Sequence, residues 1–203
     1  FYGEIKRPED WKVIPQITLN DGFMQRQIEL TKRILDGMDP EAFSIGTLHG
    51  VCASAIHPIE EEYGYEAVRN LQVNHFRENK KPIMEAWKRI ADSMARLAQK
   101  YIELGVDGVY YAGLGGEQRY FTDEEFAECI EPFDKQILQA VKSAGGYVFL
   151  HICKDGLNME RYSSYAKLSD VINWGVYEAP LSLDEGRKLF GDVTIMGGLA
   201  NRS

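Results

Sequence analysis

Residues 145–153 read Gly-Gly-Tyr-Val-Phe-Leu-His-Ile-Cys, an apolar run between a glycine pair and two side chains that can bind metals. A short apolar run bounded in this way is typical of a buried strand that opens into a loop. Residues two positions apart in an extended segment point to the same face, so His151 and Cys153 share one side. An imidazole and a thiolate together suit zinc. The run therefore predicts a strand that carries a metal-binding pair, with a core histidine and a small buried cysteine as the alternative.

Helical and strand patterns alternate along the chain. Apolar side chains at helical spacing predict helices over residues 20–36, 64–73, 82–104, 122–141, 159–168 and 182–190, the fourth of which begins with a Thr-x-x-Glu capping box at Thr122. Short apolar runs predict strands over residues 43–48, 106–111, 147–151, 170–174 and 192–196. Such repeated units with short connections imply parallel strands covered by helices. The expected fold class is α/β, either an open doubly wound sheet or a (β/α)8 TIM-type barrel with outer helices.

The length and the ends of the chain bear on the second of these folds. A complete barrel needs about 250 residues and eight strands, whereas this chain has 203 residues. It begins at Phe1 without a methionine and stops at Ser203, shortly after a predicted strand and its glycine turn. No internal repeat or Pro/Gly/Ser-rich linker divides it. We therefore expect a single, incomplete barrel domain over residues 1–203 that is truncated at both ends.

Composition excludes several classes of protein. With 44% hydrophobic and 27% charged residues the chain is an ordinary globular protein rather than a disordered one. Its net charge of -8 argues against nucleic acid or an anionic membrane surface as the main partner, because both require clustered Lys and Arg. No stretch approaches the roughly 18 apolar residues of a membrane helix, and no signal peptide opens the chain. The three cysteines are few and odd in number, which fits a reducing cytoplasm.

Further candidate residues follow the predicted strands, because both architectures place ligands at the carboxyl ends of strands. Tyr110 and Tyr111 alternate faces, so one packs under the helices and the other lines the mouth of the site. The glycines of residues 113–116 could let the backbone approach an anion, although this loop lacks the Lys-Ser/Thr of a P-loop and does not match the spacing of a dinucleotide-binding loop. His57 is a candidate acid, base or ligand, with a helix or turn boundary at His57-Pro58 as the alternative, whereas His75 is expected in solvent. No serine-hydrolase or HExxH motif is present, so hydrolase functions rank low.

Several segments, taken in succession, resemble a known family. They are Tyr101–Val109 (Tyr-Ile-Glu-Leu-Gly-Val-Asp-Gly-Val), Gly115-Gly116 followed by Tyr120–Phe126, the strand that ends in His151-Ile152-Cys153, Asp170–Trp174, and Ile195–Leu199 (Ile-Met-Gly-Gly-Leu). From about residue 40 onward this succession resembles the uroporphyrinogen decarboxylase superfamily, which also contains the cobalamin-dependent methyltransferases. The resemblance rests on the whole order of segments rather than on one motif, and it implies a TIM barrel.

The two branches of that superfamily imply different sites. Its methyltransferases bind zinc through His-x-Cys and a later cysteine, and His151 and Cys153 match the first two ligands. The third would fall beyond Ser203, and Lys154-Asp155 replaces the glycine often found after the cysteine. Its decarboxylases use no metal or other cofactor. Where they tend to carry an acidic residue this chain has Tyr111, where they use a tyrosine it has His57, and their arginine-bearing N-terminal segment is absent.

These matches and departures favour a zinc-dependent, corrinoid-linked methyltransferase that moves a methyl group to a thiol or a similar acceptor. The resemblance and the strand ends assign the residues as follows: catalytic His57, Tyr111 and Glu178; substrate-binding Tyr110, Gly115, Gly116, Arg119 and Tyr177; and metal ligands His151 and Cys153. The alternatives are a cofactor-free uroporphyrinogen decarboxylase and a non-catalytic corrinoid- or tetrapyrrole-binding protein. The expected partner is a corrinoid protein or a small tetrapyrrole, and a homodimer is one option for the assembly.

Overall fold

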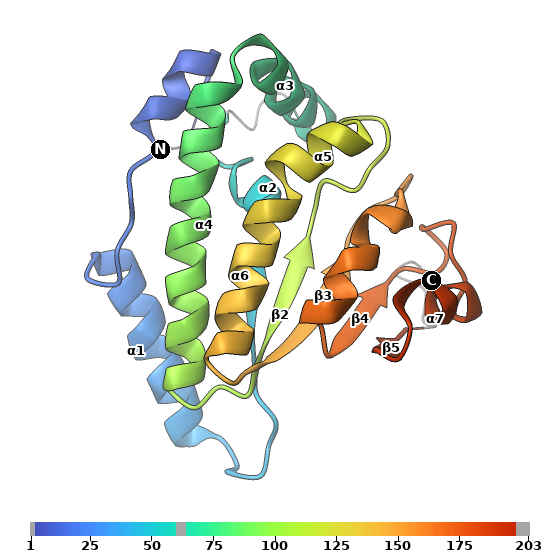
Figure 1. The fold of residues 1–203 in the computed structure, drawn as a ribbon. Helices are drawn as coiled ribbons and strands as arrows, with labels where there is room; N and C mark the ends of the chain where they lie inside the picture. Colours follow the sequence, from blue (N-terminus) through green and yellow to red (C-terminus); the bar gives the residue numbers. More distant parts are fainter. Residues whose placement is uncertain (1–2, 60–63, 198–203) are drawn as a thin grey trace.

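A five-stranded parallel sheet forms the centre of the structure, a computed structural model that describes residues 3–59 and 64–197 (Figure 1). Its strands are β1 (Ile45–His49), β2 (Gly108–Gly113), β3 (Tyr147–Ile152), β4 (Val171–Trp174) and β5 (Thr194–Met196). Each strand pairs in parallel with the next in sequence. A doubly wound sheet reverses its strand order at a switch point, whereas a barrel keeps the strands consecutive. The fold is therefore the expected α/β fold of an incomplete TIM-type barrel, with the sheet not closed.

Helices cover one face of this sheet (Figure 1). The helices of the described residues are α1 (Gly22–Gly37), α2 (Val51–Ser54), α3 (Gly64–Glu78), α4 (Lys80–Glu103), α5 (Asp123–Cys129), α6 (Glu131–Ser143) and α7 (Leu183–Phe190), with 3-10 helices η1 (Pro8–Val13) and η3 (Met159–Leu168). The long helices α4 and α6 pack against each other and against β1, β2 and β3. Val109 and Leu150 are fully buried beneath the helices, whereas Tyr110 and His151 on the other face are only partly buried. One face of the sheet is thus core, and the other is accessible.

Two predicted helices differ from the observed ones. The segment predicted as one helix from Thr122 to Val141 is divided at Ile130 into α5 and α6. Pro132 is the second residue of α6, and proline cannot donate the backbone hydrogen bond that a continuous helix requires there. The capping box at the start of α5 is present, with Thr122 accepting from the Glu125 backbone N–H at 3.2 Å. Residues 159–168 form 3-10 rather than α-helix.

A buried hydrogen bond helps to attach the N-terminal segment to the outer helices. Trp11 of η1 is fully buried, and its Nε1 donates to Nδ1 of His75 on α3 at 3.1 Å. The expectation that His75 lies in solvent is therefore wrong, and the local polar sequence gave no sign of a partner 64 residues away. Burial lowers the pKa of His75, in agreement with a neutral ring that accepts this bond. None of the described helices has the length and apolar character needed to cross a bilayer.

A polar cluster lies in the core between the sheet and the outer helices. Asp134 on α6 is fully buried and accepts hydrogen bonds from the hydroxyls of Tyr111 on β2 and Tyr165 on η3. Burial raises the pKa of Asp134 to about 7, because the ionised form loses its hydration. The cluster therefore joins β2, α6 and η3 through one carboxyl group whose protonation changes near neutral pH.

This cluster predicts a pH dependence of stability. Between pH ~4 and ~7 the folded protein holds a proton on Asp134 that the unfolded chain has released, so the stability contributed by this proton declines as the pH rises through that window. Asp134→Asn stays neutral throughout. Between pH 5 and pH 8, the free energy of unfolding of the wild type, measured with urea, should fall by about 2 kcal/mol relative to that of Asp134→Asn. A constant difference between the two proteins over this range would contradict the assignment.

Candidate functional site

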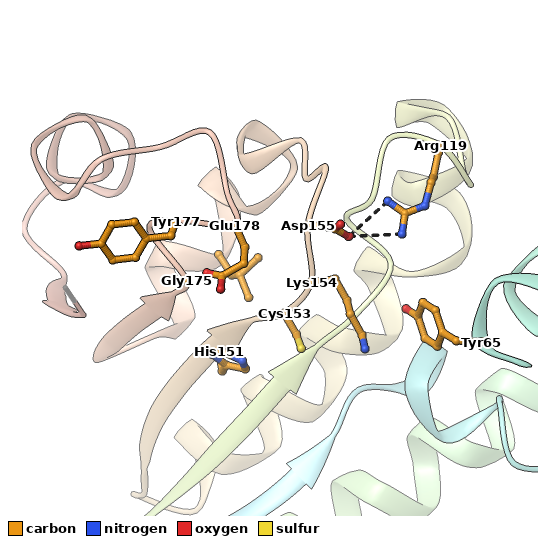
Figure 2. A pocket seen from close by; sticks show the side chains of 10 residues that line it. Tyr65, Arg119, His151, Cys153, Lys154, Asp155, Gly175, Tyr177 and Glu178 are labelled. Atoms are coloured by element: carbon orange, nitrogen blue, oxygen red, sulfur yellow. Dashed lines mark hydrogen bonds and ion pairs between the residues drawn. The ribbon is translucent and has the colours of Figure 1, made fainter. Parts of the chain in front are cut away.

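A cavity of about 630 Å³ lies at the carboxyl ends of β3 and β4 (Figure 2). Of the residues predicted from sequence, it is lined by His151, Cys153, Arg119, Tyr177 and Glu178. A second hollow of about 440 Å³ shares His151 and Cys153 with the first and adds His57 and Tyr110. The structure thus brings seven of the ten predicted site residues to two hollows that meet at His151 and Cys153.

The ring of His151 is held by a residue that the sequence analysis did not single out. Asn173 on β4 lies opposite His151 in the strand register, and its Oδ1 is 2.6 Å from His151 Nδ1. The Asn173 amide nitrogen donates to the Met196 carbonyl, which fixes its oxygen toward the histidine. Tyr110 donates to the same oxygen at 3.1 Å and stacks on the imidazole at 5.5 Å between ring centroids. Because an amide oxygen only accepts, Nδ1 carries the proton and Nε2 keeps a free lone pair.

His151 and Cys153 offer the donor types that zinc prefers. Burial lowers the pKa of His151, which favours the neutral imidazole that binds metals. Burial raises the pKa of the Cys153 thiol, and the charge of Lys154 acts in the opposite direction. A catalytic zinc usually has three protein ligands, and the described residues contain no group of three His, Cys, Asp or Glu side chains that could hold a metal. The described part of the chain therefore brings together two candidate donors, His151 and Cys153, and no third.

Three predicted residues do not line the cavity. Tyr111 faces the helices, is fully buried and donates to Asp134, so the prediction that it lines the cavity is wrong. The alternation of Tyr110 and Tyr111 is confirmed, but periodicity could not tell which of them faces inward. Gly115 and Gly116 are also buried away from the cavity. A Cβ on Gly115 would lie 2.5 Å from Ile130, and one on Gly116 would lie 2.5 Å from the Tyr162 ring. Close packing, rather than access to a ligand, accounts for these glycines.

The remaining residues lie at the rim in different states. His57 is exposed beyond α2, and Tyr177 is 72% exposed and points away from the His151–Cys153 pair (Figure 2). Arg119 is tied to Asp155, with Nη1 and Nη2 each 3.3 Å from one carboxylate oxygen. Oε2 of Glu178 is buried and has no hydrogen-bond partner within the described structure. Glu178 is thus the rim residue with acceptor capacity left for a ligand.

Comparison with known proteins assigns the family. The family model Uroporphyrinogen decarboxylase (URO-D) matches residues 2–202. The chain belongs to the URO-D family. A solved structure, a methyltransferase from Methanosarcina mazei, matches this URO-D chain with a TM-score of 0.67 at 16% sequence identity, over 91% of this chain and 51% of that one. The URO-D chain therefore spans about half the length of that structure, and the likeness concerns the fold. The curated proteins gave no match.

Membership of the URO-D family agrees with the order of segments from which the resemblance was drawn. Three residues of the site could not be identified from the sequence alone: Asn173, Tyr65 and Lys154. Asn173 was visible only as a polar residue in a predicted strand, and its role depends on its register with β3. Tyr65 comes from α3, far from the strands in sequence. Lys154 was noted as a departure from the family pattern, and the structure places it in both hollows.

The packing role of Gly116 is testable by adding one methyl group. Gly116→Ala should lower the free energy of unfolding by about 1–3 kcal/mol, because the new Cβ overlaps the Tyr162 ring. Gly37→Ala is the matched control, since a Cβ at the end of α1 meets nothing within 4 Å. Urea denaturation of both variants measures the difference. A Gly116→Ala protein as stable as Gly37→Ala would refute the packing explanation.

Proposed function

We propose that this URO-D family chain takes part in zinc-dependent, corrinoid-linked methyl transfer to a thiol or a similar acceptor. The observation that carries the proposal is the pair His151, on β3, and Cys153, directly after the end of β3, which line one cavity. Nε2 of the histidine is free while Nδ1 is bound to Asn173, as in metal sites where a polar partner orients the ligating ring. A decarboxylase that uses no cofactor has no need of a metal-binding pair.

The residues around the pair have separate roles in this proposal. His151 and Cys153 would hold zinc. Bound zinc would lower the pKa of an acceptor thiol, so that its nucleophilic thiolate form is available near neutral pH. Asn173 and Tyr110 keep the imidazole in one tautomer and one orientation. Glu178 offers its unpartnered oxygen to a donor on the substrate. In this proposal a corrinoid protein presents its methyl group at the cavity that His151 and Cys153 line.

Metal content and turnover test the proposal together. The zinc-loaded wild type should hold more zinc than Cys153→Ala or His151→Ala, because each variant lacks one of the two donors. Cys129→Ala is the matched control, because Cys129 is buried in α5 away from the cavity. Methyl transfer from methylcobalamin to a thiol, followed by the cobalamin absorbance, should fall with the zinc. Full zinc in Cys153→Ala would overturn the ligand assignment, and decarboxylation of a porphyrinogen without methyl transfer would overturn the proposed activity.

The orienting role of Asn173 gives a second prediction. Asn173→Ala removes the partner of Nδ1 and should weaken zinc binding by about 10- to 100-fold. Competition with a chromophoric chelator measures this affinity. Asn74→Ala, an exposed position on α3, should leave it unchanged. Equal affinities of the two variants would show that Asn173 does not orient the ligand.

A further inference from the structure

Lys154, which directly follows Cys153, has an unusual backbone conformation. Its φ of 88° makes it the one non-glycine residue with a positive φ among the described residues. L-amino acids with a side chain rarely adopt this region, because Cβ crowds the backbone carbonyl oxygen. Such strain persists only where the surrounding structure holds it, and it gathers at functional sites. The conformation therefore directs attention to what the Lys154 side chain does.

The side chain of Lys154 is held at the cavity by an aromatic ring. Its Nζ lies 4.3 Å from the ring centroid of Tyr65, and both residues line the two hollows (Figure 2). Tyr65 is itself fixed, because its hydroxyl donates to Glu117 at 2.7 Å. Glu117 is fully buried and lies 3.5 Å from the buried guanidinium of Arg69. A chain of contacts thus runs from the core to the ammonium group.

The charge of Lys154 is not compensated within the cavity. The other cation there, Arg119, is paired with Asp155. Lys154 has no salt-bridge partner in residues 3–59 and 64–197. Among the described residues of the cavity no second unpaired cation lies beside this ammonium group, and a single ammonium group matches a singly charged anion such as a carboxylate better than a phosphate dianion.

We propose that Lys154 is a specificity-determining residue that binds a carboxylate group of the substrate beside Cys153. The proposal rests on the proposed function only in taking this cavity as the substrate site. The strained backbone positions the ammonium group, and the Tyr65 ring keeps it over the cavity. Lys154 thereby selects substrates that carry a carboxylate next to the atom that reaches Cys153.

Two alkylating reagents that differ in charge test this preference. Iodoacetate carries a carboxylate, and iodoacetamide is its neutral counterpart. In each reaction the Cys153 sulfur bonds to the methylene carbon, the carbon–iodine bond breaks, iodide leaves and the thiol proton goes to solvent. Cys52 and Cys129 are buried, so alkylation in the folded protein reports on Cys153, and Cys153→Ser verifies this. Because both reagents meet the same thiolate, a change in the pKa of Cys153 cancels in the ratio of the two rates.

The measured quantity is the rate with iodoacetate divided by the rate with iodoacetamide. Lys154→Met should lower this ratio about threefold, as expected for the loss of one partly exposed ion pair. Lys154→Arg should largely restore it, and Lys32→Met, an exposed lysine on α1, should leave it unchanged. An equal ratio in the wild type and Lys154→Met would overturn the proposal.

The strain offers an independent check with a different variant. Lys154→Gly removes both the charge and the steric cost, so it should show the lowered ratio together with a higher melting temperature than Lys154→Met. A Lys154→Gly protein that keeps the wild-type ratio would also overturn the proposal. These measurements need neither metal nor methyl donor. They can therefore contradict the role of Lys154 while the proposed methyl transfer holds, and they can support that role while the proposed methyl transfer fails.

Discussion

The hydrogen-bond register of the parallel sheet is the constraint on which the site depends. It aligns His49, Ala112, His151, Asn173 and Met196 in one row across the five strands. Side chains along a strand alternate between faces, so a slip of one residue in β3 would turn His151 and Cys153 toward the helices. The same slip would separate His151 from Asn173. The register is stabilised by the apolar side chains on the face of the sheet that the helices cover.

Local spacing was enough to predict the parts of the site that lie within one strand. The shared face of His151 and Cys153 follows from the two-residue period of an extended chain, and the strand positions followed from short apolar runs. The partners across strands were not predictable in this way. Asn173 holds His151 only because β4 pairs with β3 in one register, and Tyr111 lies under α6 because the helices cover its face of the sheet. Both depend on contacts between segments distant in sequence.

Much of the polar chemistry in this chain supports the site rather than forming it. Glu117 and Arg69 are buried together, and they fix the ring of Tyr65 that faces the cavity. Asp134 joins the sheet to α6 and η3 from the opposite face. Buried polar groups are costly unless they are paired, so these networks hold their neighbours in single arrangements. The cavity side chains His151, Lys154 and Glu178 then stand on a rigid frame.

Zinc X-ray absorption spectroscopy of the zinc-loaded wild type tests the central claim most directly. The account predicts one sulfur neighbour at about 2.3 Å and imidazole nitrogen at about 2.0 Å from the metal. In Cys153→Ala the sulfur neighbour should disappear, and in His151→Ala the imidazole contribution should disappear. A spectrum with only oxygen and nitrogen neighbours in the wild type, or one that Cys153→Ala leaves unchanged, would contradict the account.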